Sequence, residues 1–173
     1  LIYDFIALLG DKKKITKEVA DCLYTGIMTD TGSFRYPSTT AKTHRVVAEL
    51  IQAGAENGEI HRWVYDNNTP SRLKLLGHCL GEELNVIEEY SAAYFSLDQQ
   101  ELEKFNYKKG DTEGIVNYPL SIKSVQFSAF FVERDGIIKI SFRSKGKFDV
   151  NKFARNHFNG GGHANAAGGM SNL

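Results

Sequence analysis

Three consecutive glycines, Gly160 to Gly162, followed directly by His163, are the feature of this sequence best suited to binding a ligand. Glycine permits backbone conformations that aim successive N–H groups at one point, and such a concave arrangement binds anions. A helix that began at His163 would add its free N–H groups and its dipole. The His163 ring would donate to a phosphate oxygen. The alternative interpretation is a turn that only ends the preceding helix, and no Gly-Lys-Ser/Thr follows to make a Walker A loop.

A second feature is the alternation of apolar and polar residues from Ile138 to Gly146. The period of two predicts a strand with one polar face, formed by Lys139, Ser141, Arg143 and Lys145. Arg143 and Lys145 would then point the same way, about 7 Å apart along the strand. A guanidinium fork and an ammonium in this arrangement suit a phosphoryl group. The alternative is a polar edge strand, because lysine commonly protects sheet edges from pairing.

A third feature is Asp30, which lies between Thr29 and the pair Thr31-Gly32 at the end of a helical pattern. A carboxylate in this position could ligate a hard cation such as Mg²⁺ or Mn²⁺. It could equally be a turn or capping residue, because a single aspartate does not make a metal site.

The charge of the chain is zero in total but unevenly distributed. Lysine plus arginine and aspartate plus glutamate each number 21. From Gly136 to the C-terminus, however, six basic residues accompany one acid, Asp149. A stretch of this sign attracts phosphate even in a neutral protein.

Helical periodicity dominates the first 85 residues or so. We expect helices near residues 1–9, after Thr16, after Thr39-Thr40 and after Asn57, with Trp63 of the last one predicted to be a core residue. Thr69-Pro70 is typical of a cap and first helical position.

The period then changes toward two. We expect strands over residues 90–97, 125–133 and 137–145, with a hairpin turn at Asp135-Gly136. Asp98 and Asp149 are predicted to begin helices. The sequence therefore predicts a mostly helical part, residues 1–85, followed by an α/β module with a mixed sheet, residues 86–173.

The composition is that of a globular chain of 173 residues, with 42% hydrophobic and 24% charged residues. Cys22 and Cys79 stand apart, which argues against a disulfide scaffold and fits a reducing compartment. No apolar run approaches the about 20 residues needed to span a bilayer. We therefore predict no membrane association and a cytoplasmic location.

Taken together, these motifs resemble the DHH–DHHA1 phosphoesterases. Gly26 to Phe34 resembles the last conserved block of the DHH domain, and Phe142 to Gly146 together with Gly160 to His163 resemble the substrate-binding strand and glycine–histidine loop of the DHHA1 domain. Within the family, the chain is most similar to the nanoRNase type. These enzymes degrade very short oligoribonucleotides and remove the 3′-phosphate from phosphoadenosine phosphate.

The resemblance implies a role for each candidate residue. Asp30 would be a ligand of a centre of two Mn²⁺ ions, with Mg²⁺ as the alternative ion. The substrate-binding residues would be Arg143, Ser144, Lys145, Gly161, Gly162 and His163. The expected partners are short RNA or a nucleotide, and the sequence leaves open whether the protein is a homodimer.

The family's upstream Asp-x-Asp and Asp-His-His blocks do not occur in this sequence. We expect them before Leu1, because the chain opens within a helical pattern, so the catalytic residues cannot be assigned here. The competing hypothesis is a nucleotide-binding module without turnover. Within the enzyme class, a cyclic dinucleotide phosphodiesterase, a single-strand exonuclease and a polyphosphatase are further alternatives.

Overall fold

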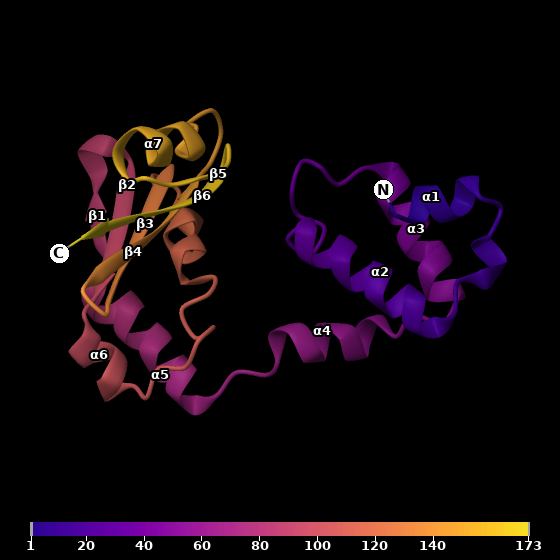
Figure 1. Cartoon of the computed structure of the whole chain (residues 1–173), viewed down its shortest axis with the longest axis horizontal. Coiled ribbons are helices and arrows are strands. Elements are labelled where there is room, and N and C mark those ends of the chain that lie inside the picture. The colour runs from indigo at the N-terminus through magenta and orange to yellow at the C-terminus, as the bar shows by residue number, and fades with distance from the viewer. Residues whose placement is uncertain (1, 173) are drawn as a thin grey trace. The chain divides into compact units, whose positions relative to one another are not determined.

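The computed structural model describes residues 2–172, which form two compact units, one up to Asn67 and one from Asn68 onward (Figure 1). The first unit is helical, as the periodicity predicts. Its elements are α1 (Ile2–Leu8), the 3₁₀ turn η1 (Lys12–Lys14), α2 (Lys17–Asp30), α3 (Ala41–Gln52) and α4 (Asn57–Tyr65). None of the helices in residues 2–172 is long and apolar enough to cross a bilayer.

Threonine caps set the starts of two helices in the first unit. The hydroxyl of Thr16 accepts the N–H of Val19, and Thr40 and Thr43 form a reciprocal capping box. Buried residues of α2, α3 and α4, including Met28, Leu50 and Ile60, form the core.

The prediction that Trp63 is a core residue is wrong, because its side chain is 62% exposed. The short helix α4 turns Ile60 and Val64 toward the core of the first unit, and Trp63 lies beside this narrow stripe.

The second unit is built on a six-stranded mixed sheet, in agreement with the predicted α/β class. The strands are β1 (Asn85–Ile87), β2 (Ala92–Leu97), β3 (Phe127–Arg134), β4 (Ile137–Ser144), β5 (Gly161–His163) and β6 (Ala166–Asn172). Their order is β1-β2-β3-β4-β6-β5, with β2 and β3 parallel and the other neighbours antiparallel. The β3–β4 turn is the predicted one, since Asp135 and Gly136 both have positive φ.

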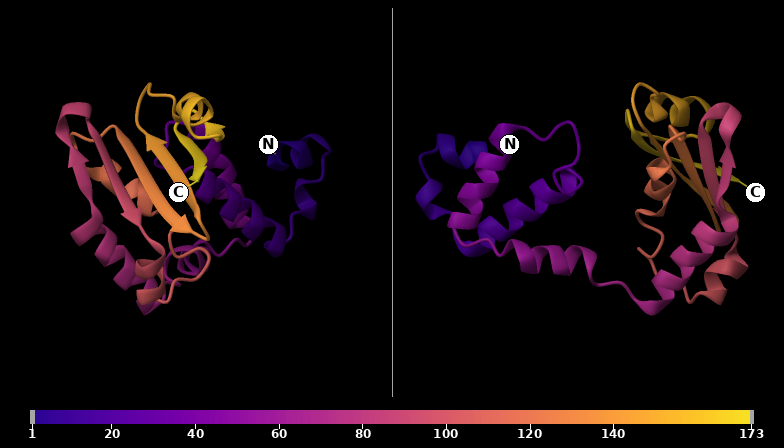
Figure 2. Two further views of the ribbon diagram at one scale, coloured as in Figure 1. Left: turned by 60° about the vertical axis from the view of Figure 1, so that its left-hand side comes forward. Right: turned by 180° about the vertical axis from the view of Figure 1, so that it is seen from behind.

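The two faces of the sheet carry different cores (Figure 1, Figure 2). On one face, α7 (Val150–His157) packs against Ile140, Phe142 and Ala167. On the other, Phe95 and Phe130 pack under a second set of elements: α5 (Pro70–His78), the π-helix η2 (Cys79–Glu83), α6 (Gln99–Lys104) and the 3₁₀ helix η4 (Ile115–Ser121). A short 3₁₀ turn, η3 (Glu88–Tyr90), precedes β2.

The first helix of the second unit lies before the predicted boundary near residue 85. Leu75 of α5 and Cys79 of η2 are buried with Phe95 and Phe130 of the sheet. The contacts therefore place the segment from Asn68 with the α/β module, because its apolar face is covered by the sheet.

The glycine–histidine segment is not the start of a helix, which corrects the conditional prediction at His163. Residues 161–163 form β5, which pairs with β6 in a hairpin. A Cβ at Gly160 would lie 1.9 Å from the carbonyl oxygen of Gly168, and one at Gly162 would lie 2.4 Å from that of Ala166. These glycines therefore allow two backbone segments to approach more closely than any side chain permits.

We predict that Gly160→Ala destabilises the chain by about 1–3 kcal/mol, because the added methyl group meets backbone that cannot rotate away. Urea unfolding measures the change. Gly77→Ala in α5 is the matched control, since a Cβ there meets nothing within 4 Å. In a helix that substitution should be neutral or stabilising by up to about 1 kcal/mol. Equal stability of the two variants would contradict the close approach.

The two cysteines should differ in reactivity. Burial, and after it the charges of Glu101 and Glu83, raise the pKa of the Cys79 thiol to about 12, whereas Cys22 is exposed. Because the thiolate is the reactive form, we expect one thiol per native chain to react with dithiobis-nitrobenzoate at pH 8, and two in urea. Cys22→Ser should abolish the fast reaction. A fast reaction in that variant would show that Cys79 is accessible.

Candidate functional site

Arg143 and His163 lie in one row across the sheet, although 20 residues separate them. Arg143 of β4 pairs with Ala166 of β6, which pairs with His163 of β5. Paired residues project their side chains from the same face of a ladder. Two strand spacings separate the backbones of Arg143 and His163, or about 10 Å. The fold thus brings these two predicted substrate-binding residues to one surface.

The surface between these two side chains has little covering it. Ala166 contributes only a methyl group, and the next row consists of Ser141, Gly168 and Gly161. Gly161, Ala166 and Gly168 are partly exposed, and Met170 farther along β6 is 53% exposed. A planar or anionic ligand could therefore lie directly on the backbone of β6 and β5. We call this face of Arg143, Ser141, Ala166, Gly168 and His163 the glycine platform.

Ser144 is placed away from the glycine platform. Its side chain is buried, its hydroxyl donates to the carbonyl oxygen of Phe148, and it accepts a hydrogen bond from Asn165 Nδ2 at 2.9 Å. Asn165 also donates to the carbonyl oxygen of Gly146. These bonds tie the end of β4 to the β5–β6 turn.

Lys145 lies one residue beyond β4, and its ammonium is directed to the backbone. Lys145 Nζ donates to the carbonyl oxygens of Val125 at 3.2 Å and Ile122 at 3.4 Å. An ammonium has three donors, and these contacts use two of them. Lys145 therefore stabilises the segment leading into β3 and retains one N–H for another acceptor.

Gly161 and Gly162 are held at the edge of the sheet by α7. Asn151 Oδ1 accepts the backbone N–H of Gly162 at 2.9 Å and the Nε–H of Arg155 at 3.0 Å. The N–H of Gly162 is thus used within the protein. This arrangement differs from the expected nest of anion-binding N–H groups, because the glycines serve close strand packing instead.

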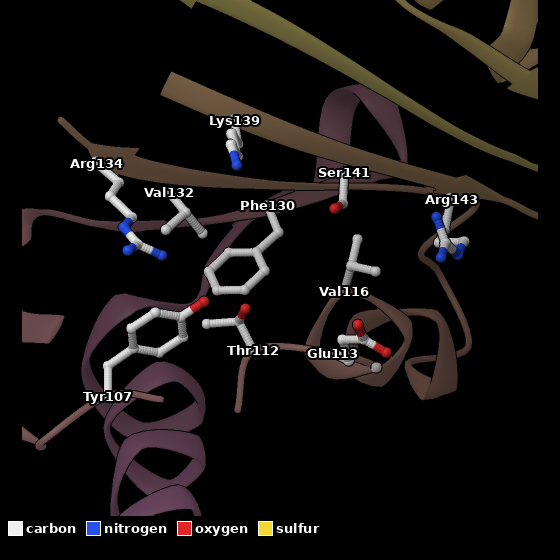
Figure 3. A pocket seen from close by; sticks show the side chains of 11 residues that line it. Tyr107, Thr112, Glu113, Val116, Phe130, Val132, Arg134, Lys139, Ser141 and Arg143 are labelled. Atoms are coloured by element: carbon white, nitrogen blue, oxygen red, sulfur yellow. The ribbon is translucent and has the colours of Figure 1, made fainter. Parts of the chain in front are cut away.

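A hollow of about 360 Å³ continues from Arg143 along β4 (Figure 3). Its rim holds three cationic side chains, and Figure 3 shows Lys139 and Ser141 projecting from β4 toward the loop of Thr112 and Glu113. Phe130, Val116 and Val132 form its apolar part. The full lining is Tyr107, Thr112, Glu113, Gly114, Val116, Phe130, Val132, Arg134, Lys139, Ser141 and Arg143.

Only some of the residues that line this hollow can be predicted from the alternating pattern of β4. Lys139 and Ser141 share a face with Arg143, as alternation predicts, although they were not among the expected site residues. Tyr107, Thr112 and Glu113 come from an irregular segment before η4, and no local pattern in the sequence points to them.

Asp30 lies in the first unit, as the last residue of α2, with an exposed side chain. Within residues 2–172, the one group of three or more metal-ligating side chains is His78, Glu83 and Glu101, which does not include Asp30. Asp30 thus offers a single accessible carboxylate, which fits one ligand of a hard divalent cation and is not a site by itself.

Comparison with known proteins matches the second unit to a family model. Residues 89–173 match the model of the DHHA1 domain. The chain is also 36% identical over 172 residues to the probable bifunctional oligoribonuclease and PAP phosphatase NrnA of Streptococcus mutans. It is 34% identical over 155 residues to the NrnA of Bacillus subtilis. These alignments cover 99% and 90% of this chain, but 53% and 48% of the relatives.

A solved structure agrees with the fold. The exopolyphosphatase-related protein of Bacteroides fragilis superimposes with a TM-score of 0.94 at 46% identity, over 97% of this chain and 49% of that one. The chain thus spans about half the length of the proteins it matches. Residues 89–173 therefore form a DHHA1 domain, and over nearly its whole length the chain is similar to the NrnA proteins.

Proposed function

We propose that the protein containing this chain hydrolyses short oligoribonucleotides, 3′-phosphoadenosine 5′-phosphate, or both, and that this chain binds the substrate phosphate. The observation that carries the proposal is the row of Arg143, Ala166 and His163 on the glycine platform. The names of the relatives, which are oligoribonucleases and PAP phosphatases, support the choice of substrates.

Arg143 would bind the phosphate through its guanidinium. Arg143 Nη1 donates to the carbonyl oxygen of Phe142 at 2.9 Å, which fixes the side chain close to the strand. The planar fork of N–H groups of a guanidinium matches two phosphate oxygens, and such charge-assisted pairs are strong. His163 would donate to an oxygen on the far side of Ala166.

The hollow beside Arg143 would hold a neighbouring part of the substrate. Lys139 lies four residues from Arg143 on the same face of β4, or about 13 Å along the strand. Phe130 and Val116 form an apolar surface next to polar side chains of the rim. This combination suits a nucleoside, which has an apolar base face and polar groups on its sugar and base. A small substrate is therefore favoured over a long single strand, for which an extended row of exposed aromatic rings is typical.

Catalysis would require a divalent metal, which we expect to be Mn²⁺. When bound, two such ions would activate water and stabilise charge at the phosphoryl group. Asp30 would contribute one carboxylate to this centre. The remaining ligands are expected from Asp-x-Asp and Asp-His-His blocks, which the 173 residues do not contain.

The second candidate function is binding without turnover. It is favoured by one observation, namely that the chain holds the phosphate-binding residues of the glycine platform but a single expected metal ligand, Asp30. A DHHA1 unit of this kind would bind a nucleotide and release it unchanged.

The affinity of the 173-residue chain for a nucleotide tests whether Arg143 and His163 bind the phosphate. We expect Arg143→Ala and His163→Ala each to weaken the binding of 3′-phosphoadenosine 5′-phosphate by about 5–100-fold, the loss of one charged or polar contact. Isothermal titration measures the change. Lys152→Ala is the matched control, because Lys152 lies on α7 with its side chain 79% exposed. Binding that falls equally in all three variants would indicate nonspecific electrostatics.

Product analysis with the full-length protein tests turnover. We expect hydrolysis of a ribodinucleotide and of 3′-phosphoadenosine 5′-phosphate, with kcat/KM for both reduced at least tenfold by Arg143→Ala. Asp30→Asn should lower kcat by at least tenfold in Mn²⁺, because a metal ligand is lost. Release of unchanged nucleotide would favour the binding module. Faster hydrolysis of a cyclic dinucleotide or polyphosphate would replace the proposed substrates.

A further inference from the structure

A cluster of three potential metal ligands lies in the second unit. It shares no residue with the glycine platform. His78 is the last residue of α5, Glu83 ends the π-helix η2, and Glu101 lies in α6. One ligand atom from each lies within 4.8 Å of the other two. Their side chains are 13%, 26% and 23% exposed. The cluster is therefore half-buried, unlike an ordinary group of surface carboxylates.

Both carboxylates approach the same ring nitrogen. His78 Nε2 lies 2.6 Å from Glu101 Oε1 and 3.9 Å from Glu83 Oε1. The ring nitrogen carries at most one proton, so it can satisfy one of the two carboxylates well. The second carboxylate is then brought close to a like charge without a hydrogen bond to compensate for its lost hydration.

The charge of the cluster is not balanced by nearby cations. In the part of the chain that the structure describes, no lysine or arginine nitrogen lies within 4.0 Å of either carboxylate. Two carboxylates and one imidazole leave a net negative charge even when the ring is protonated. A bound cation would remove this imbalance.

The ligand atoms are held in place by the surrounding structure. Glu101 is part of the capping box of α6: its Oε2 accepts the N–H of Asp98 at 2.8 Å, which leaves Oε1 directed at His78. The ring of His78 lies against that of Phe105, with centroids 5.0 Å apart. The π-helical turn η2 places Glu83 beside His78, five residues earlier in the chain. Such turns are often found at functional sites.

We propose that His78, Glu83 and Glu101 bind one divalent transition-metal ion, of which Zn²⁺ is the best match. Zinc binds imidazole nitrogen and carboxylate oxygen at about 2.0–2.2 Å, so donors around one ion lie roughly 3 Å apart. The observed separations of 2.6 and 3.9 Å lie on either side of this value. All three ligand atoms lie within 4.8 Å of one another, so shifts of about 1–1.5 Å would admit the ion. The imidazole favours zinc over Mg²⁺ and Ca²⁺, which prefer oxygen ligands.

The ion would join α5 and η2 to α6, on the side of the sheet that Leu75 and Leu102 cover. With three protein ligands, it would keep a position open to water. Its expected effect is to stabilise the second unit, so binding and thermal stability are the appropriate readouts rather than hydrolysis.

The test is titration of the metal-free 173-residue chain with ZnCl₂, followed by calorimetry and melting temperature. We expect one Zn²⁺ per chain with a micromolar or lower dissociation constant, and a melting temperature that rises with Zn²⁺. Glu83→Gln should weaken the binding at least tenfold and reduce the rise in melting temperature. His78→Gln should do the same. Co²⁺ in place of Zn²⁺ should give visible absorption bands that both variants lose.

Glu89→Gln and His157→Gln are the matched controls, since both residues lie in the second unit with exposed side chains. They should bind Zn²⁺ like the unaltered chain. Glu83→Gln removes no hydrogen bond of the described structure, so it should fold even if His78→Gln does not. Absence of Zn²⁺ binding, equal weakening by the control variants, or unchanged binding in Glu83→Gln would each overturn the proposal, as would stoichiometric binding of Mg²⁺ but not Zn²⁺.

Discussion

The pairing of β4 with β6 is the interaction on which the second unit depends. It joins residues 137–143 to residues 166–172 and leaves β5, reached after α7, at the edge of the sheet. The order places Arg143 and His163 in one row, two strands apart. A shift of this register by one residue would turn Arg143 toward α7 and bury its charge beside Phe153 and Phe158. The cost of burying that charge helps to fix the register.

Glycine serves this pairing twice. Gly160 and Gly162 permit close backbone approach to Gly168 and Ala166, while the partly exposed Gly168 adds no side chain to the glycine platform. Some glycines of this segment therefore allow tight packing, and another leaves part of the surface accessible. Lys145, Ser144 and Asn165 hold the segments around this surface through hydrogen bonds to backbone and to one another. The residues proposed to bind phosphate directly are then few, with Arg143 and His163 as the principal pair.

The His78–Glu83–Glu101 cluster lies in a different part of the second unit. The physical question there is how two close carboxylates are accommodated. There the fold brings two carboxylates to one imidazole at a half-buried position, and a cation would balance their charge. A metal ion at this point would stabilise the helices covering the sheet. The proposed phosphate site and the proposed metal site thus have opposite local charges, and both are compatible with a total charge of zero.

The sequence by itself determined most elements and their faces. Thr16, Thr40, Thr69, Asp98 and Asp149 cap helices as predicted, and the alternation along β4 places Arg143 opposite Phe142. These features depend on local hydrogen bonds and on the period of two, which a sequence displays directly. The tertiary structure alone decided that Gly161–His163 is an edge strand, that Ser144 is buried, and that His78 meets Glu83 and Glu101. Each depends on contacts with residues distant in sequence, whose partners no local pattern specifies.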